Sequence, residues 1–183
     1  MIQILYKNRI AVALLLAFLF VILTACINDH EGKNDSTVKV KVGDRIPSFV
    51  LTCFDGNDLS SSSLYGQAYI LNFFDTGCPD CQRVLPELQR IYDAYHKSVP
   101  VLNVPRSQTK EAIQEYWDKA GLTMPFYIPY DKNLYYQFAT KGIPRTYVID
   151  GQGKVCGAFC DSPTANYNTL DSILRQVMPD ETK

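Results

Sequence analysis

Two cysteines separated by two residues, Cys78 and Cys81, lie in the stretch FFDTGCPDCQRVLPELQRIY, where an apolar run meets an amphipathic one. Thiols at this spacing can exchange with a disulfide, because one thiolate attacks a substrate sulfur and the second displaces the mixed disulfide that results. The same spacing also occurs in structural disulfides and in zinc sites. The residues around the pair, and the elements that position it, decide which chemistry applies.

A metal site at these cysteines would need further ligands. The two histidines of the chain are His30, in a polar N-terminal segment, and His96, at the far end of the helix predicted after Cys81. Cys156 and Cys160 lie about 13 Å apart along a predicted strand, which is awkward for joint coordination. We therefore favour redox chemistry and predict no metal.

The segment after Cys78 has the pattern of a helix, because apolar residues recur every three or four positions: Val84, Leu85, Leu88, Ile91, Tyr92 and Tyr95. Pro79 suits the first helical position, where its missing N–H leaves no bond unmade. The first N–H groups of a helix lack internal partners and the helix dipole is positive there, so a Cys78 thiolate is expected to be stabilised. Cys81 is expected one turn inside and more shielded. Asp80 competes for the same positive field, which favours a reducing pair.

Strand and helix patterns alternate along the chain. Apolar alternation or continuous apolar runs predict strands over residues 38–42, 49–53, 68–74, 99–104, 146–149 and 154–160. Apolar stripes predict helices over 79–95, 110–120, 131–138 and 170–177, with Asp131 as a cap and Gly121 and Gly142 as stops. Turn signals at 55–57 and 150–153 predict two hairpins. This order predicts one α/β domain over residues 38–183, a three-layer sandwich with a central mixed sheet flanked by helices.

The N-terminus has the pattern of an export signal. Lys7 and Arg9 precede an uncharged apolar run of 14 residues, which suits a signal peptide and is short for a span of about 20 residues. Leu-Thr-Ala before Cys26 resembles the lipobox of bacterial lipoproteins, which implies removal of residues 1–25 and lipid on Cys26. An uncleaved anchor helix is the alternative. Residues 26–37 are polar and are predicted to be a flexible tether.

Three further stretches carry a family resemblance: AYILNFFDTG before CPDC, Pro86 in the following helix, and GIPRT running into YVIDGQGKV. Together they resemble the thioredoxin fold and, within it, the membrane-tethered TlpA/ResA-like branch. The similarity extends from about Gly43 to the C-terminus. It includes the N-terminal hairpin and a helix–strand segment that this branch inserts, residues 107–128. The resemblance implies a cis peptide bond between Ile143 and Pro144, packed against the disulfide and offering a strand-like edge to a substrate chain.

The resemblance implies a membrane-tethered, extracytoplasmic thiol–disulfide oxidoreductase that needs no cofactor. In this mechanism Cys78 is the nucleophile that attacks the substrate disulfide, and Cys81 resolves the mixed disulfide and leaves the Cys78–Cys81 pair oxidised. The expected partners are disulfide-containing exported proteins, with cytochrome c precursors among the candidates, and an upstream membrane electron donor. We expect a lipid-anchored monomer facing the periplasm, with Ile27 after the lipidated cysteine favouring the outer membrane and the cell surface left open. The formal net charge of −1 and the lack of a basic patch exclude nucleic acid.

Three positions depart from the family pattern. Gly77 stands where the family usually has tryptophan, Asn72 where thioredoxin has a buried aspartate, and Val84 where ResA-like members have glutamate. No obvious buried general base remains. Asp75 and Asp80 are close in sequence and are the candidates for proton transfer, although each also fits a solvated loop or helix start.

The remaining cysteines leave pairing open. If Cys26 carries lipid, five cysteines remain, an odd number that cannot all pair within one chain. Cys156 and Cys160 are expected to lie too far apart on one strand to bond each other. Cys53 is the candidate partner for one of them.

Two rival functions use the same thiols. The first is a redox-inactive chaperone that binds a metal or a haem-protein precursor; copper chaperones of this fold carry C-x-x-x-C and a later histidine, which this chain lacks after His96. The second is a peroxidase of the peroxiredoxin type, whose pattern places threonine three residues before the reactive cysteine. Here Thr76 stands two before Cys78. Both patterns fit less well than disulfide exchange.

Overall fold

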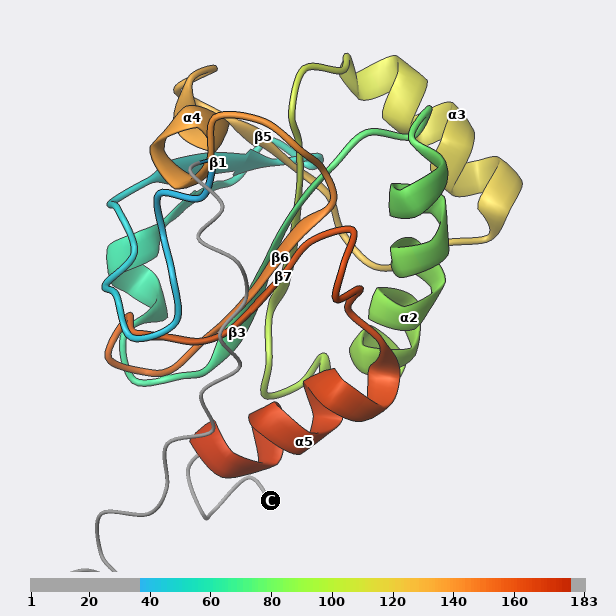
Figure 1. Ribbon diagram of the computed structural model, residues 1–183. Helices are drawn as coiled ribbons and strands as arrows, with labels where there is room; N and C mark the ends of the chain where they lie inside the picture. The colour runs from blue at the N-terminus through green and yellow to red at the C-terminus, as the bar shows by residue number, and fades with distance from the viewer. Residues whose placement is uncertain (1–36, 179–183) are drawn as a thin grey trace, which may run out of the picture. The chain divides into compact units, whose positions relative to one another are not determined.

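Figure 1 shows the computed structural model, which describes residues 37–178. A four-stranded sheet runs through it in the order β4-β3-β6-β7. Strand β3 spans Tyr69–Phe74, β4 Val101–Pro105, β6 Arg145–Ile149 and β7 Val155–Phe159. Strand β3 pairs in parallel with β4 and antiparallel with β6, and β6 pairs antiparallel with β7. The central sheet is therefore mixed, as the sequence predicts.

Three helices cover one face of this sheet and enclose the first apolar core (Figure 1). Helix α2 spans Pro79–Tyr95, α3 Lys110–Ala120 and α5 Tyr167–Val177. Their buried side chains pack against two residues of β3, Ile70 and Phe74. Because successive side chains of a strand point to opposite faces, the alternate residues of β3 belong to a second core: Tyr69, Leu71 and Phe73.

Short elements cover the second face. Strands β1, Val50–Cys53, and β2, Asp58–Ser60, form the predicted N-terminal hairpin, and the 3-10 helix η1, Ser61–Leu64, follows it. Helix α4, Leu134–Phe138, supplies three buried residues to the same core. With layers on both faces of the sheet, the protein is the three-layer α/β sandwich expected from its sequence.

The hairpin belongs to a second, smaller sheet rather than to the central one. Strand β1 pairs antiparallel with β2 and with β5, Tyr127–Pro129, in the order β2-β1-β5. One parallel bridge joins Asn103 of β4 to Phe126, the residue before β5. Pro125 and Pro129 limit further pairing, because proline has no N–H to donate. The inserted segment thus places α3 on the helical face and β5 in the small sheet.

The strand predicted over residues 38–42 is wrong in extent. Val38 makes a single bridge to Ala139, and the chain then turns between Lys41 and Asp44. Gly43 follows with a φ of 97°, a left-handed conformation that glycine adopts at little cost. The turn interrupts pairing before a strand can form.

Helix α4 begins later than predicted, at Leu134 instead of directly after Asp131. It ends at Phe138, where Ala139 is extended and pairs with Val38, so Gly142 is not its stop and lies in a later turn with a φ of 86°. Asp131 accepts a hydrogen bond from the Asn133 N–H, and Asn133 itself is the N-cap. By contrast, α3 has the predicted bounds and ends at left-handed Gly121.

The predicted signal peptide, the lipidated Cys26 and the tether up to residue 36 lie outside the described residues. Within residues 37–178, no helix is long and apolar enough to cross a membrane.

Candidate active site

Cys78 is the N-cap of α2, and Pro79 occupies the first helical position. The Cys78 side chain accepts no hydrogen bond from a helical N–H, so its sulfur is not tied to the first turn of α2. It is half-buried and lies 3.7 Å from the carbonyl oxygen of Ile143. A sulfur in this position is accessible to a substrate and faces the positive end of the helix dipole.

Cys81 lies one turn further along α2 and is 0% exposed. Burial is the main cause that raises the pKa of its thiol to about 12; a hydrogen bond from the Asp75 backbone opposes it, and the neighbouring Cys78 and the Asp75 carboxylate add to it. Because only the thiolate attacks a disulfide, Cys81 needs to lose a proton before it can react. The two cysteines therefore differ chemically: the Cys78 sulfur is accessible, whereas the Cys81 thiol is buried and protonated.

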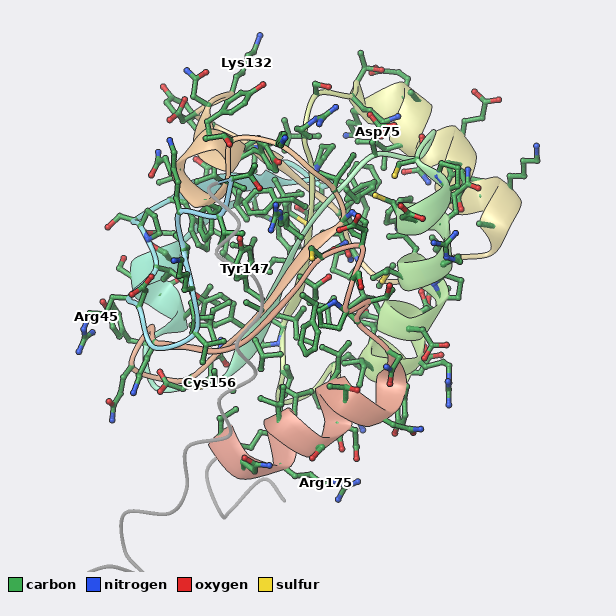
Figure 2. The ribbon with its side chains drawn as sticks, viewed as in Figure 1. Arg45, Asp75, Lys132, Tyr147, Cys156 and Arg175 are labelled. Atoms are coloured by element: carbon green, nitrogen blue, oxygen red, sulfur yellow. The ribbon has the colours of Figure 1, made fainter. Side chains whose placement is uncertain are left out.

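The two acidic candidates occupy different environments. Asp75 lies in the loop between β3 and α2 (Figure 2), close enough to Cys81 to influence its pKa. Asp80 forms an ion pair with Arg83 on the exposed side of α2. The structure thus brings Asp75, but not Asp80, to the buried thiol.

The peptide bond between Ile143 and Pro144 is cis. The carbonyl oxygen of the preceding residue, Gly142, accepts hydrogen bonds from the Tyr135 hydroxyl at 2.7 Å and from Arg145 Nε at 3.3 Å. Arg145 is 5% exposed, so water competes little for its guanidinium. These contacts hold the loop between α4 and β6 beside Cys78.

Tyr135 and Arg145 are supports that the sequence did not reveal as part of the site. The apolar pattern of α4 predicts that Tyr135 is packed in the core, and its ring does lie against Phe73 with centroids 5.7 Å apart. The hydrogen bond from its hydroxyl to the Gly142 carbonyl joins α4 to the following loop, and no sequence pattern predicts this bond. In the sequence, an arginine directly after Gly142-Ile143-Pro144 is the signal that could have suggested a contact with this loop.

Asn72, which stands where the family resemblance implies a buried aspartate, is buried and belongs to a network of neutral polar groups. Asn72 Nδ2 donates to Asn103 Oδ1 at 3.2 Å, and Thr146 Oγ1 donates to Asn72 Oδ1 at 3.0 Å. Asn103 Nδ2 donates in turn to the Pro125 carbonyl at 3.0 Å. These neutral groups satisfy one another across β4, β3 and β6. They contribute no titrating group beneath the dithiol.

The other three described cysteines are free thiols in the structure, as are Cys78 and Cys81. Burial is the main cause of a raised pKa at Cys53, Cys156 and Cys160, which disfavours their reactive thiolates. Cys156 is the second residue of β7 and lies at the end of the sheet away from Asp75 (Figure 2). No disulfide joins Cys53 to either of the others in the described part of the chain.

Metal binding has no ready-made cluster in the described region. Across residues 37–178, no group of three or more His, Cys, Asp and Glu side chains is placed to hold a metal ion.

The sheet, the helices and the dithiol at the start of α2 define a thioredoxin-like protein, and solved structures agree. A thiol:disulfide interchange protein of the thioredoxin family from Chlorobium tepidum TLS superposes with a TM-score of 0.64 at 25% identity, covering 76% of this chain and 99% of that one. StoA from Bacillus subtilis superposes with a TM-score of 0.57 at 23% identity, covering 69% and 96%. The fold class is thereby confirmed.

Sequence comparison gives the family. Residues 42–157 match the AhpC/TSA family. Thiol-disulfide oxidoreductase ResA of Geobacillus kaustophilus is 31% identical over 140 residues, which cover 75% of this chain and 80% of that protein. ResA of Bacillus anthracis is 24% identical over 176 residues, covering 94% and 99%. The chain belongs to the AhpC/TSA family and, within it, to the ResA/TlpA-like branch. It is a thiol–disulfide oxidoreductase.

Proposed function

We propose that this oxidoreductase reduces disulfides in exported proteins through the motif Cys78-Pro79-Asp80-Cys81. The observation that carries the proposal is the inequality of the two thiols: Cys78 is accessible beside the Ile143 carbonyl, and Cys81 is buried one turn behind it. A dithiol of this kind first captures a substrate and then releases it. The relatives named ResA share the oxidoreductase chemistry.

The exchange proceeds in two displacements. The Cys78 thiolate attacks one sulfur of the substrate disulfide, whose S–S bond breaks, and the other substrate sulfur leaves as a thiolate. Cys81 then loses its proton and attacks the Cys78 sulfur, which forms the Cys78–Cys81 disulfide and expels the second substrate thiolate. Two electrons pass from the dithiol to the substrate. An upstream membrane dithiol donor returns them.

Asp75 is the proposed acceptor of the Cys81 proton. Its backbone and carboxylate both influence the Cys81 pKa, and Cys81 itself belongs to the first apolar core. A carboxylate so placed can act as a general base in the resolving step. Asp80, paired with Arg83, is assigned no proton transfer.

The carbonyl edge at Ile143 and Pro144 is the proposed docking site for the substrate chain. The Ile143 carbonyl already lies beside the Cys78 sulfur. A substrate segment that adds alongside this loop would bring its disulfide to Cys78 by backbone hydrogen bonds, independent of its side chains. Such docking suits an enzyme that acts on several exported proteins.

Insulin reduction in the presence of dithiothreitol tests the roles of the two cysteines. We expect the parent protein to accelerate the reaction and Cys78→Ser to abolish the acceleration. Cys81→Ser is expected to accumulate a mixed disulfide on Cys78, because the resolving sulfur is gone. Expressed in the native host, the same variant should trap the client proteins. Parent-like insulin reduction by Cys78→Ser would show the assignment to be wrong.

The proposed location is the periplasmic side of a membrane, with lipid on Cys26 and the outer membrane favoured. The short apolar run and the residues before Cys26 support this proposal. Cys26→Ser should move the protein from the membrane fraction to the soluble fraction and abolish labelling with a fatty acid. Unchanged fractionation and labelling would contradict the lipid anchor.

A further inference from the structure

The turn that presents Cys78 is built on Asp75. The Cys78 N–H donates to the Asp75 carbonyl at 3.1 Å, and the Gly77 N–H donates to Asp75 Oδ1 at 2.8 Å. These two bonds close the turn and place Cys78 at the start of α2. They leave the polar groups of the intervening residue, Thr76, to be satisfied from elsewhere.

Two glutamine side chains hold Thr76. The Thr76 N–H donates to Gln108 Oε1 at 2.8 Å, and Gln108 Nε2 donates to Thr76 Oγ1 at 2.7 Å. Gln82 Nε2 donates to the Thr76 carbonyl at 2.8 Å. The backbone N–H, the carbonyl and the hydroxyl oxygen of Thr76 are thus all bound, at distances typical of good hydrogen bonds.

Gln108 comes from a distant part of the chain. It lies between β4 and α3, in the segment that the branch inserts, and it is half-buried. Its carboxamide makes two hydrogen bonds to Thr76: the oxygen accepts from the Thr76 N–H, and the nitrogen donates to the Thr76 hydroxyl oxygen. Two bonds to the same residue restrict the orientation of Thr76 more than a single bond would.

We propose that Gln108 is a positioning residue for the Cys78 sulfur. By holding Thr76, it fixes the turn that sets Cys78 Sγ 3.7 Å from the Ile143 carbonyl. The inference rests on the proposed roles of Cys78 as nucleophile and of the Ile143 edge as docking site. Exchange needs the attacking sulfur in line with the substrate S–S bond, so a small displacement slows it when the substrate is held in place. A small, freely diffusing disulfide can adjust its approach and is insensitive to the same displacement.

Gln108→Ala tests the inference with two disulfides of different size. For the reduced variant, the rate constant with insulin should fall about tenfold, and that with 5,5′-dithiobis(2-nitrobenzoate) should change by less than about twofold. Gln114→Ala is the matched control, because Gln114 lies exposed on α3 and its amide bonds to Asp118 at 2.8 Å. It should leave both rates unchanged.

A second pair of variants keeps the test independent of the folding of Gln108→Ala. Thr76→Val removes the hydroxyl that Gln108 binds and retains the shape, so it should reproduce part of the insulin defect. Thr76→Ser retains the hydroxyl and should restore the parent rate. The thermal unfolding midpoint of each variant, compared with that of the parent, tests whether the fold is intact.

Parent-like insulin rates in Gln108→Ala and Thr76→Val would overturn the inference. Equal losses with insulin and the small disulfide would overturn it as well, because they would indicate a general loss of thiol reactivity. Cys78→Ser, measured in parallel, separates this outcome from failure of the proposed function. If Cys78→Ser is inactive and Gln108→Ala is unimpaired, the proposed function stands and only the positioning role is lost.

Discussion

At the scale of single residues, Cys78 and Cys81 differ in reactivity because their surroundings differ. Cys78 ends a loop and lies half-buried at the start of α2, whereas Cys81 is enclosed by the first core. The burial that raises the pKa of Cys81 to about 12 leaves it almost wholly protonated near neutral pH. Resolution of the mixed disulfide is therefore the step that most needs a proton acceptor.

We expect Asp75→Asn to slow resolution of a Cys78 mixed disulfide by about tenfold or more near neutral pH, because a general base is lost. The defect should shrink toward about pH 9, since the Cys81 thiolate fraction grows tenfold per pH unit below its pKa. Rapid-mixing kinetics on a preformed mixed disulfide measures this step directly.

The sign of the change distinguishes two roles of Asp75. As a charge alone, the carboxylate raises the Cys81 pKa, so its removal would lower that pKa and accelerate resolution. Faster release by Asp75→Asn would therefore contradict the role as a base. Asp80→Asn is the matched control, because Asp80 is paired with Arg83 and should leave the step unchanged.

At the scale of elements, the loop between α4 and β6 carries the docking edge, and Gly142 is its critical position. Gly142 adopts a φ of 86°, and an added Cβ would lie 3.2 Å from Arg145 Nη2. Gly142→Ala should destabilise the protein by about 1 kcal/mol through backbone strain. It should also slow insulin reduction, because the guanidinium that holds the loop has to move.

Gly43→Ala is the control for Gly142→Ala. Gly43 has a similar φ of 97°, and an added Cβ there meets nothing within 4 Å. Urea unfolding should show comparable losses for the two variants, while insulin reduction should fall in Gly142→Ala alone. Equal insulin rates in both would mean that the contact with Arg145 does not support the docking edge.

At the scale of the whole described domain, the two cores bury ionisable groups in their neutral forms. Burial raises the pKa of Cys81, Tyr127 and Tyr147 to about 12 and that of Tyr69 further. In the unfolded chain these groups ionise at about 8.5 for cysteine and about 10 for tyrosine. The folded protein therefore binds more protons than the unfolded chain in alkaline solution.

Stability should accordingly fall as the pH rises from about 9 toward about 12, because the unfolded state loses protons that the folded state retains. The urea midpoint, followed across this range, measures the effect. The oxidised protein should lose less stability than the reduced one, since Cys81 then has no proton to retain. A midpoint that stays constant over the range would contradict the burial of these groups.

The sequence by itself determined the elements and the dithiol. Apolar periodicity records which residues each helix or strand buries, so the bounds of α3, the buried strand β3 and the stripe of α2 followed from local pattern. Cys78 and Pro79 at the start of α2 followed from the requirements of a helix N-terminus, which are also local. The weaker predictions were the strand over residues 38–42, of which only Val38 forms a bridge, and the start of α4.

Only the tertiary structure decided which side chains meet at the site. It brought Asp75 rather than Asp80 to Cys81, and it joined Gln108 to Thr76 across 32 residues of chain. It also placed the N-terminal hairpin with β5 in a second, smaller sheet. Periodicity specifies the face that an element buries, but the distances between elements come from how their side chains pack together, and a single stretch of sequence does not contain them.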